Sequence, residues 1–222
     1  MTNIELIQNY KTWLQDQAEK SDNTIKNYQL DIKIFAKWYN RNLLTVAKQD
    51  IENFKSYMLN EKKWSSSTRN RRIISLRGFY QYLEDEELIQ ENPTEKVIIP
   101  KVPERQPDYL TENEAIRLVK ATETQEEPLK SRDKAIIVLF LTTGLRLSEL
   151  TNIKLQDINE STLRVIGKGN KERLLNLNPD TIMVIENYLQ VRYGSSNQLF
   201  LTQHGKPMTS QAVQYTIKKY IK

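Results

Sequence analysis

Arg146 is the residue of this sequence whose type and setting best suit chemistry on an anion. The run Ala135–Leu141 is entirely apolar and predicts a buried helix, which breaks at Gly144 and restarts one residue before the arginine. We expect an arginine beside such a helix end to be held by packing. Its planar guanidinium carries a fork of donors that matches two phosphate oxygens at once. The pattern therefore predicts a phosphate-binding arginine.

Glu149 follows Arg146 by three positions, so the two side chains lie on the same turn of a helix. One interpretation is a local ion pair on a solvated face, which contributes a few tenths of a kcal/mol. In the other, Arg146 clamps a phosphate while the acid holds the arginine or caps the helix. The spacing alone does not decide between them.

A second group of basic residues lies at 167–173, in the sequence Gly-Lys-Gly-Asn-Lys-Glu-Arg between two apolar stretches. Lys168 occupies the apex of the expected turn, and flanking glycines let such a lysine reach beyond its own backbone. It can then touch a DNA base edge or donate a proton to a leaving oxygen. A solvated turn carrying Lys168, Lys171 and Arg173 is the alternative.

Basic charge is also concentrated at 62–77, which holds six lysines and arginines and no acid, whereas five acids follow at 84–91. This asymmetry favours one docking surface, and the net charge of +5 points to nucleic acid. An ordinary basic protein has the same net charge. Arg69, Arg71 and Arg72 are expected in the first turn of a helix, where basic side chains and the helix N-terminus can contact phosphate. A basic face that serves only solubility remains the alternative.

Composition excludes several other kinds of site. The sequence has no cysteine and one histidine, so disulfides, thiolate metal sites and multi-histidine metal clusters are ruled out. The segment Met1–Glu5 lacks the basic and apolar regions of a secretory signal. No apolar run approaches the roughly 20 residues of a membrane span. We therefore expect a cytoplasmic protein without a membrane partner.

The elements that would position these residues fall into two groups. Apolar and aromatic residues recur every three or four positions through four segments of the first ninety residues, which predicts a compact bundle of four helices with an aromatic core. The second segment follows the N-cap residue types Ser21-Asp22-Asn23, and the fourth starts at the run Ser65-Ser66-Ser67-Thr68. Four prolines between 92 and 108 then predict an interdomain linker.

The second group, from Tyr109 onward, is expected to be mostly helical with one small antiparallel element. Thr111 and Glu114 have the spacing of a capping box that opens a helix. The segments 162–166 and 173–177 read as two strands around the Gly-Lys-Gly-Asn turn. Further helices are expected from Pro179 and from Thr209.

Taken in order, these motifs resemble the tyrosine recombinases, the phage-integrase and Xer-like family, over nearly the whole chain. The stretch 143–150 is similar to the family's first arginine motif, and 167–173 is similar to its β-hairpin lysine motif. Both motifs are fairly specific, and their order adds to the resemblance. The remaining similarities are Thr24–Tyr28 and Ser67–Ile73 to the core-binding domain, Asn92–Pro93 to the linker, and Tyr109–Thr111 to the start of the catalytic domain.

The resemblance implies a mainly α protein. A four-helix, SAM-like core-binding domain would span 1–91, a linker 92–108, and a partial α+β catalytic domain with a small antiparallel β element 109–222. It implies a site-specific DNA recombinase or integrase that cuts and rejoins DNA through a 3′-phosphotyrosyl link. Arg146 would neutralise the phosphate and Lys168 would assist protonation of the leaving 5′ oxygen. Because the covalent link conserves the phosphodiester energy, no ATP, metal or other cofactor is expected.

The same resemblance implies that two basic domains clamp double-stranded DNA from opposite sides. The DNA would carry inverted-repeat core sites, and a homo-oligomer would assemble on it. The source would be a mobile element or a chromosome-resolution system. The residues expected to contact DNA are Lys26, Arg69, Arg71, Arg72, Arg77, Lys171 and Arg173.

The sequence departs from the family after its last expected helix. Members also carry a His-x-x-Arg motif, a further histidine or tryptophan and a tyrosine nucleophile, which would follow that helix. His204 has no arginine three positions later, and we interpret Tyr215 and Tyr220 as core residues of the final helix. We therefore expect a truncated recombinase that binds DNA without cleaving it. A DNA-binding module that competes with a full-length recombinase, or a helical transcription regulator, is the alternative.

Overall fold

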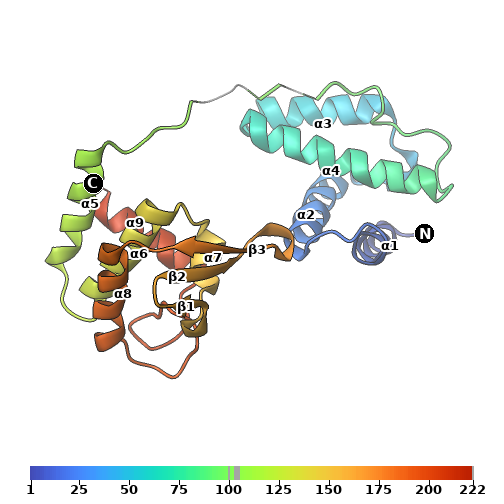
Figure 1. Ribbon diagram of the computed structural model, residues 1–222. Helices are drawn as coiled ribbons and strands as arrows, with labels where there is room; N and C mark the ends of the chain where they lie inside the picture. The colour runs from blue at the N-terminus through green and yellow to red at the C-terminus, as the bar shows by residue number, and fades with distance from the viewer. Residues whose placement is uncertain (100, 103–105, 222) are drawn as a thin grey trace. The chain divides into compact units, whose positions relative to one another are not determined.

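The computed structural model describes residues 1–99, 101–102 and 106–221, which form two compact units, Met1–Gln106 and Pro107–Lys222 (Figure 1). Each unit has its own apolar core and is described by itself. Pro100 and Pro103, which the sequence assigns to a linker, lie outside the described residues.

The described residues of the first unit form four α-helices, as predicted. Ser21 and Ser65 each cap a helix, because their hydroxyls accept a hydrogen bond from the backbone N–H three residues later. Glycine is needed inside the last of these helices for space, since a Cβ at Gly78 would lie 2.9 Å from the hydroxyl of Tyr10. The helices are α1 (Asn3–Asp16), α2 (Asp22–Tyr39), α3 (Lys48–Asn60) and α4 (Ser66–Asp85), with a short 3₁₀ turn η1 (Leu43–Thr45) between α2 and α3.

Aromatic rings fill the centre of this unit, which confirms the expected aromatic core. The ring of Phe35 packs edge-on against Phe54 at 5.0 Å and against Tyr80 at 6.4 Å between centroids. Tyr10 packs edge-on against Phe79 at 5.3 Å. Such pairs contribute about 0.5–1.5 kcal/mol beyond the apolar area that they bury. The core therefore fixes the positions of the four helices on which the basic residues lie.

Residues that follow α4 continue to pack on this unit. Thr94 and Val97 are buried, and the guanidinium of Arg77 donates to the carbonyl of Val97 at 2.8 Å. The beginning of the proline-rich stretch is thus attached to the first unit. The domain boundaries expected from the sequence stay a prediction.

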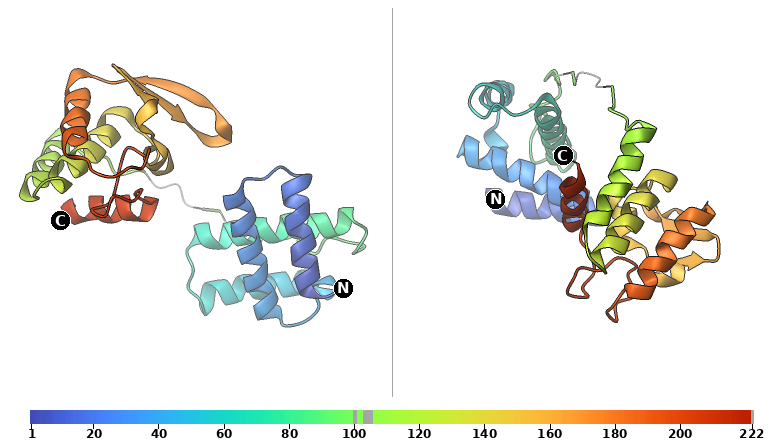
Figure 2. Two further views of the ribbon diagram at one scale, coloured as in Figure 1. Left: turned by 90° about the horizontal axis from the view of Figure 1, so that it is seen from below. Right: turned by 90° about the vertical axis from the view of Figure 1, so that its left-hand side faces the viewer.

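The second unit contains helices and a three-stranded antiparallel sheet in the order β1-β2-β3. Helices α6 and α8 pack against each other, and the β2–β3 hairpin extends away from the helices (Figure 2). The first strand was not expected from the sequence, because two residues are too few to show a pattern. The elements are α5 (Glu112–Ala121), η2 (Thr122–Thr124), α6 (Leu129–Thr143), α7 (Leu147–Asn152), η3 (Leu155–Asp157), β1 (Ile158–Asn159), β2 (Thr162–Ile166), η4 (Lys168–Asn170), β3 (Glu172–Asn176), α8 (Pro179–Val191) and α9 (Ser210–Tyr220).

The described helices and strands confirm the mainly α fold class with a small antiparallel element. Strand β3 begins and ends one residue earlier than predicted. Within the described part of the chain, no helix is long and apolar enough to cross a membrane.

Candidate functional site

Arg146 lies at the junction between helices α6 and α7. Helix α6 ends at Thr143 and is capped by Gly144, whose left-handed conformation (φ 62°) favours glycine and whose N–H donates to the carbonyl of Phe140. Helix α7 begins at Leu147, so Arg146 is its N-cap residue. The predicted restart one residue before the arginine was wrong, because the chain at Arg146 is still extended (φ −72°, ψ 150°).

Glu149 both caps this helix and holds the arginine, so the structure combines the two roles that the sequence allowed for it. Its Oε2 accepts a hydrogen bond from the backbone N–H of Arg146 at 2.8 Å, and its Oε1 accepts one from Arg146 Nη1 at 3.0 Å. The carboxylate is almost fully buried, with 3% of the side chain exposed, whereas the Arg146 side chain is 68% exposed. The expectation that packing holds Arg146 was therefore wrong, and one buried acid does so instead.

Arg173 on β3 completes the site. Its Nη1 donates to Glu149 Oε1 at 3.0 Å and its Nη2 donates to Glu149 Oε2 at 2.8 Å, a bidentate pair. Hydrogen bonds from Arg173, and then from Arg146, lower the pKa of Glu149 to about 2 against the opposing effect of burial. The acid is therefore ionised at neutral pH and shared by two guanidinium groups.

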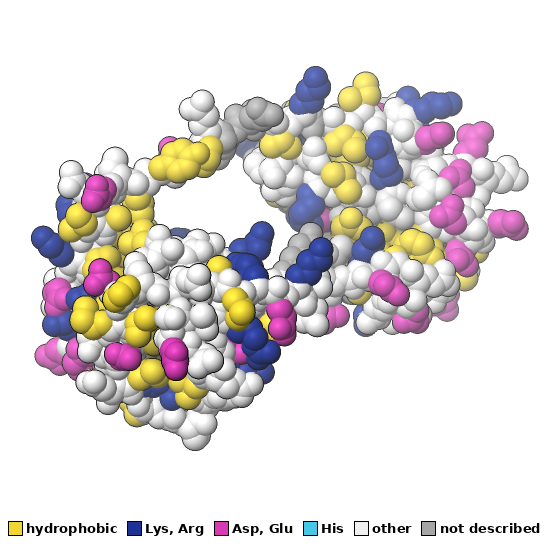
Figure 3. Space-filling model, viewed as in Figure 1, with side chains coloured by type: hydrophobic (Ala, Val, Ile, Leu, Met, Phe, Trp, Pro, Cys, Tyr) yellow, Lys and Arg dark blue, Asp and Glu magenta, His cyan; other side chains and the backbone are white. Residues whose placement is uncertain are grey.

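The turn between β2 and β3 brings the lysine motif to the end of the hairpin. The N–H of Gly167 donates to the carbonyl of Lys171 at 2.8 Å, and Gly169 takes the left-handed conformation (φ 74°). Lys168 begins the η4 turn, but its side chain lies outside what the structure describes. Lys171 is exposed. Lys and Arg side chains gather around this hairpin on the face of the second unit drawn in Figure 3.

A second arginine on the hairpin was missed by the sequence analysis. Arg164 donates from Nη2 to Asp157 Oδ1 at 2.7 Å and from Nε to the same oxygen at 3.1 Å. Asp157 also caps η3, because its Oδ2 accepts from the N–H of Lys154. Alternation along β2 puts Arg164 on the solvent side, but nothing in the sequence pattern points to its acid partner.

In the first unit, the arginines expected to contact DNA have internal partners. Both ends of the Arg71 guanidinium donate to Asp31 of α2, with Nη2 at 3.0 Å from Oδ1. Ser75 donates to the same carboxylate at 2.7 Å. Arg72 is buried and stacks on the Trp64 ring at 3.8 Å.

The position of the arginines in α4 differs from the prediction, and their contact with DNA is not tested by the structure. Arg71 and Arg72 lie in the second turn of α4 rather than the first, because the helix begins at Ser66. Arg69 donates to the carbonyl of Trp64 at 3.1 Å. Lys26 is exposed on α2. A DNA contact by any of these residues stays a prediction.

Asp31 is a structural residue that the sequence analysis overlooked. It is 1% exposed and accepts the hydrogen bonds that join α2 to α4. A signal was present, because Asp31 lies three residues after Tyr28 and four before Phe35, on the apolar face of its helix. An acid at such a position requires a buried partner.

The tyrosines of α9 differ from the expected core residues. Tyr215 is 78% exposed, so its assignment to the core was wrong: it lies on the outer face of the helix. Tyr220 is partly buried, and its hydroxyl donates to Asp133 at 2.7 Å. Burial and this hydrogen bond both raise the pKa of Tyr220 above its ordinary value.

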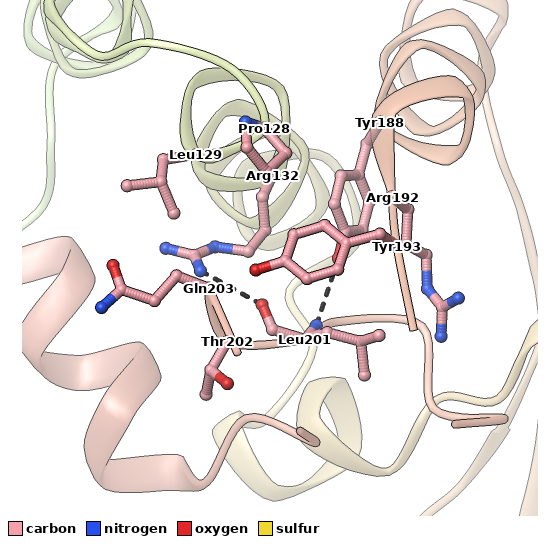
Figure 4. Close-up of a pocket in the computed structure, with 9 residues that line it drawn as sticks. All are labelled: Pro128, Leu129, Arg132, Tyr188, Arg192, Tyr193, Leu201, Thr202 and Gln203. Atoms are coloured by element: carbon pink, nitrogen blue, oxygen red, sulfur yellow. Dashed lines mark hydrogen bonds between the residues drawn. The ribbon is translucent and has the colours of Figure 1, made fainter. Parts of the chain in front are cut away.

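Arg132 next to Asp133 holds the neighbouring loop. Its Nη1 donates to the carbonyl of Leu201 at 3.1 Å, while the N–H of Leu201 donates to the hydroxyl of Tyr188 (Figure 4). The cavity beside these side chains is about 10 Å³. This is about the space for one water, so it does not suit an organic ligand.

Comparisons with solved structures give the same architecture. The structure is similar to the lambda integrase (75–356) dimer bound to a COC′ core site, with a TM-score of 0.80 at 18% identity over 99% of this chain and 80% of that one. It is also similar to the Tn1549 transposon integrase in complex with circular intermediate DNA, with a TM-score of 0.72 at 20% identity over 100% of this chain and 79% of that one. The fold is therefore lambda integrase-like.

Sequence comparisons identify the family. Residues 108–222 match the phage integrase family, and residues 7–87 match the phage integrase N-terminal SAM-like domain. The chain is 34% identical to the tyrosine recombinase XerC of Caldanaerobacter subterraneus subsp. tengcongensis, over 98% of this chain and 68% of the relative. It is 35% identical to the tyrosine recombinase XerD of Proteus mirabilis, over 94% of this chain and 69% of the relative. The chain belongs to the phage integrase family of tyrosine recombinases.

Proposed function

We propose that this chain binds duplex DNA at recombination sites and that Arg146 holds a backbone phosphate there. The observation that carries the proposal is that Arg146 is held in place and yet exposed. Glu149 fixes its backbone and one guanidinium nitrogen, yet 68% of the side chain remains exposed to an incoming anion. A guanidinium held in this way needs little reorganisation when negative charge builds up on phosphate oxygens. Site-specific recombination is the family activity that this arrangement supports.

The other roles in the proposal follow from chemistry and from the family. Lys168, at the end of the hairpin, would supply the proton to the leaving 5′ oxygen. Lys26 and Lys171 are exposed cations available to DNA phosphates. Four of the residues expected to contact DNA would act mainly by shaping the surface, because their guanidinium groups make contacts inside the first unit: Arg69, Arg71, Arg72 and Arg77.

We also propose inverted-repeat core sites and a homo-oligomer on DNA as partners. The related solved structures include a lambda integrase dimer on a core site and a lambda integrase tetramer on a Holliday junction. In this assignment residues 1–91 form the core-binding domain, 92–108 the linker and 109–222 the catalytic domain. A mobile-element or chromosome-resolution setting and a cytoplasmic location belong to the same proposal.

For the 222-residue chain itself we propose DNA binding without strand cleavage. Of the five tyrosines in the second unit, Tyr188 and Tyr220 have hydroxyls that are engaged inside the protein, and burial raises the pKa of each. Both are therefore poor nucleophiles at neutral pH. The other three, Tyr109, Tyr193 and Tyr215, are exposed. A nicked suicide substrate tests this directly. A covalent protein–DNA adduct after denaturation would overturn the proposal, whereas a mobility shift without an adduct supports it and the alternative of a competing DNA-binding module.

The phosphate role of Arg146 is tested by the salt dependence of DNA binding. A duplex selected by the protein from a random-sequence pool is titrated by fluorescence anisotropy between about 50 and 200 mM salt. Arg146→Ala should weaken binding and reduce the slope of log K against log salt by about 0.9, the value of one phosphate contact. Arg164→Gln, which removes the same charge from a residue tied to Asp157, is the matched control and should leave the slope unchanged. Equal slopes for wild type and Arg146→Ala would refute the proposal.

A further inference from the structure

Among the described residues, two arginine–carboxylate pairs join the β2–β3 hairpin to the rest of the second unit, in addition to the core packing of Leu163 and Val165. Arg173 lies opposite Val165, and Arg164 lies opposite Leu174. Side chains alternate along a strand, so the two arginines project from opposite faces of the hairpin. Val165 is buried and Leu174 is exposed, which makes the Arg173 face the inner one. The inner pair is the one that reaches the Arg146 site.

We propose that Arg173 is a positioning residue, which holds the end of the hairpin and the Arg146 guanidinium in a fixed relation by binding the same carboxylate as Arg146. The inference rests on the proposed function, in which Arg146 binds a DNA phosphate. Arg173 was expected from the sequence to contact DNA. Both ends of its guanidinium instead donate to Glu149, at 3.0 and 2.8 Å.

The hydrogen bonds of Glu149 support this role. Oε1 accepts from Nη1 of Arg146 and from Nη1 of Arg173, both at 3.0 Å. Oε2 accepts from the backbone N–H of Arg146 and from Nη2 of Arg173, both at 2.8 Å. A carboxylate has about four lone-pair sites, so these four bonds saturate it. A movement of β3 would therefore change the bonds that orient Arg146.

Gly167 makes room for the shared carboxylate. Its backbone (φ −94°, ψ −165°) is extended, so any residue type could adopt it. A Cβ at this position would lie 3.2 Å from Arg173 Nη1 and 3.3 Å from Glu149 Oε1. The glycine is thus explained by close approach to the ion pair and not by backbone conformation. The turn that carries Lys168 therefore starts at a position where a larger residue would crowd the pair.

The charges of Arg146, Arg173 and Glu149 indicate that the two arginines have different roles. Two guanidinium groups share one carboxylate, so the cluster keeps a net charge of +1. Arg146 is 68% exposed, whereas Arg173 is 38% exposed with both ends of its fork engaged. The remaining charge is therefore presented mainly by Arg146. Loss of Arg173 should leave Glu149 to neutralise Arg146 alone and should release the hairpin.

Three variants of the full chain test the inference: Arg173→Gln, Arg173→Lys and the matched control Arg164→Gln, which breaks the outer pair. Inorganic phosphate is titrated while the side-chain Nε–H resonance of Arg146 is followed by ¹⁵N NMR. We expect at least fivefold weaker phosphate binding for Arg173→Gln, an intermediate loss for Arg173→Lys, and less than a twofold change for Arg164→Gln. The lysine restores the charge but not the bidentate fork. Full restoration by lysine would show that charge alone acts, and would overturn the positioning role.

A second measurement needs no phosphate. The Glu149 carboxyl is titrated by ¹³C NMR in the same proteins, and hydrogen exchange of α6 confirms that each variant is folded. The pKa of Glu149 should rise by at least one unit in Arg173→Gln and should not change in Arg164→Gln. A phosphate response in wild type that Arg173→Gln leaves unaltered refutes the positioning role alone. Absence of any response at Arg146 in wild type, with the Glu149 titration shifted as expected, refutes the proposed function, and the inference falls with it.

Discussion

Replacement of Asp31 should destabilise the first unit more than the small size of this side chain suggests. The carboxylate is 1% exposed and accepts bonds from Arg71 and Ser75, and its Oδ1 is 3.8 Å from the Nε of Arg72. Arg72 is 8% exposed, and two of its guanidinium nitrogens have no hydrogen-bond partner among the described residues. Without Asp31, a buried positive charge loses its nearest compensation.

The size of the effect follows from these contacts. Breaking a buried ion pair by removing one partner costs about 3–5 kcal/mol. The Arg71 side chain is 42% exposed and can turn to water, so its share is discounted. We therefore expect Asp31→Ala to lower the free energy of unfolding of the first unit by about 3 kcal/mol. Asp31→Asn, which keeps the shape but removes the charge, should lose about 2 kcal/mol.

Tryptophan fluorescence is a selective assay for this effect. The three tryptophans, Trp13, Trp38 and Trp64, all lie in the first unit, so urea unfolding followed by their emission reports on that unit in the intact chain. Glu52→Ala is the control, because its pair with Lys55 is partly exposed and should contribute at most about 0.5 kcal/mol. An Asp31→Asn protein within 0.5 kcal/mol of wild type would show that the buried charge does not join α2 to α4.

Four other perturbations have defined outcomes. The folded-state pKa of Glu149, about 2, lies below the ordinary 4.5, so the stability that this carboxylate contributes is complete above pH 4.5 and is lost as the pH falls towards 2. Hydrogen exchange of α6 should record a loss of about 2 kcal/mol in the free energy of unfolding, after discounting for the exposure of both arginines. Glu149→Gln should abolish this acid dependence. Gly167→Ala should destabilise the hairpin by about 1–3 kcal/mol in the same assay, and unchanged exchange would mean that the ion pair yields to the new Cβ. Lys171→Ala should reduce the salt slope of DNA binding by about 0.9 while stability stays within about 0.5 kcal/mol, and a constant slope would remove Lys171 from the interface. Tyr220→Phe should cost about 1–3 kcal/mol through the lost bond to Asp133 and should leave DNA affinity unaltered, whereas unchanged stability would show that this bond does not hold α9.

Local signals in the sequence were sufficient for most of the fold. The four helices of the first unit, the serine caps of α2 and α4, and the β2–β3 hairpin depend on periodicity and turn chemistry within a few residues. Strand β1 could not be predicted, because it has two residues and pairs only with β2. Strand β3 was placed one residue late: the bond from the Gly167 N–H to the Lys171 carbonyl closes a loop of five residues, 167–171, whereas the predicted strands left six between them.

The candidate site was predictable where its contacts are local. Glu149 was expected to cap a helix or hold Arg146, three residues away, and it does both. Its bond to Arg173 joins residues 24 positions apart, and the bond from Arg71 to Asp31 spans 40. No periodic pattern encodes such pairs. The number of basic residues in the sequence therefore overestimates how many arginines have guanidinium N–H groups available to DNA.

Two properties distinguish Arg146 from the other arginines that were expected to contact DNA: its exposure, and the small number of its guanidinium nitrogens that bind an internal partner. Arg71 and Arg173 each use both ends of the guanidinium on a buried acid, and Arg72 is covered by Trp64. Arg146 commits one terminal nitrogen to Glu149 and keeps the rest of its fork in solvent. An arginine bound at both ends would have to break its internal pair before it met a phosphate, and the acid left behind would then be uncompensated. Phosphate affinity should therefore be concentrated at Arg146 and at exposed lysines, while the paired arginines determine where those groups stand.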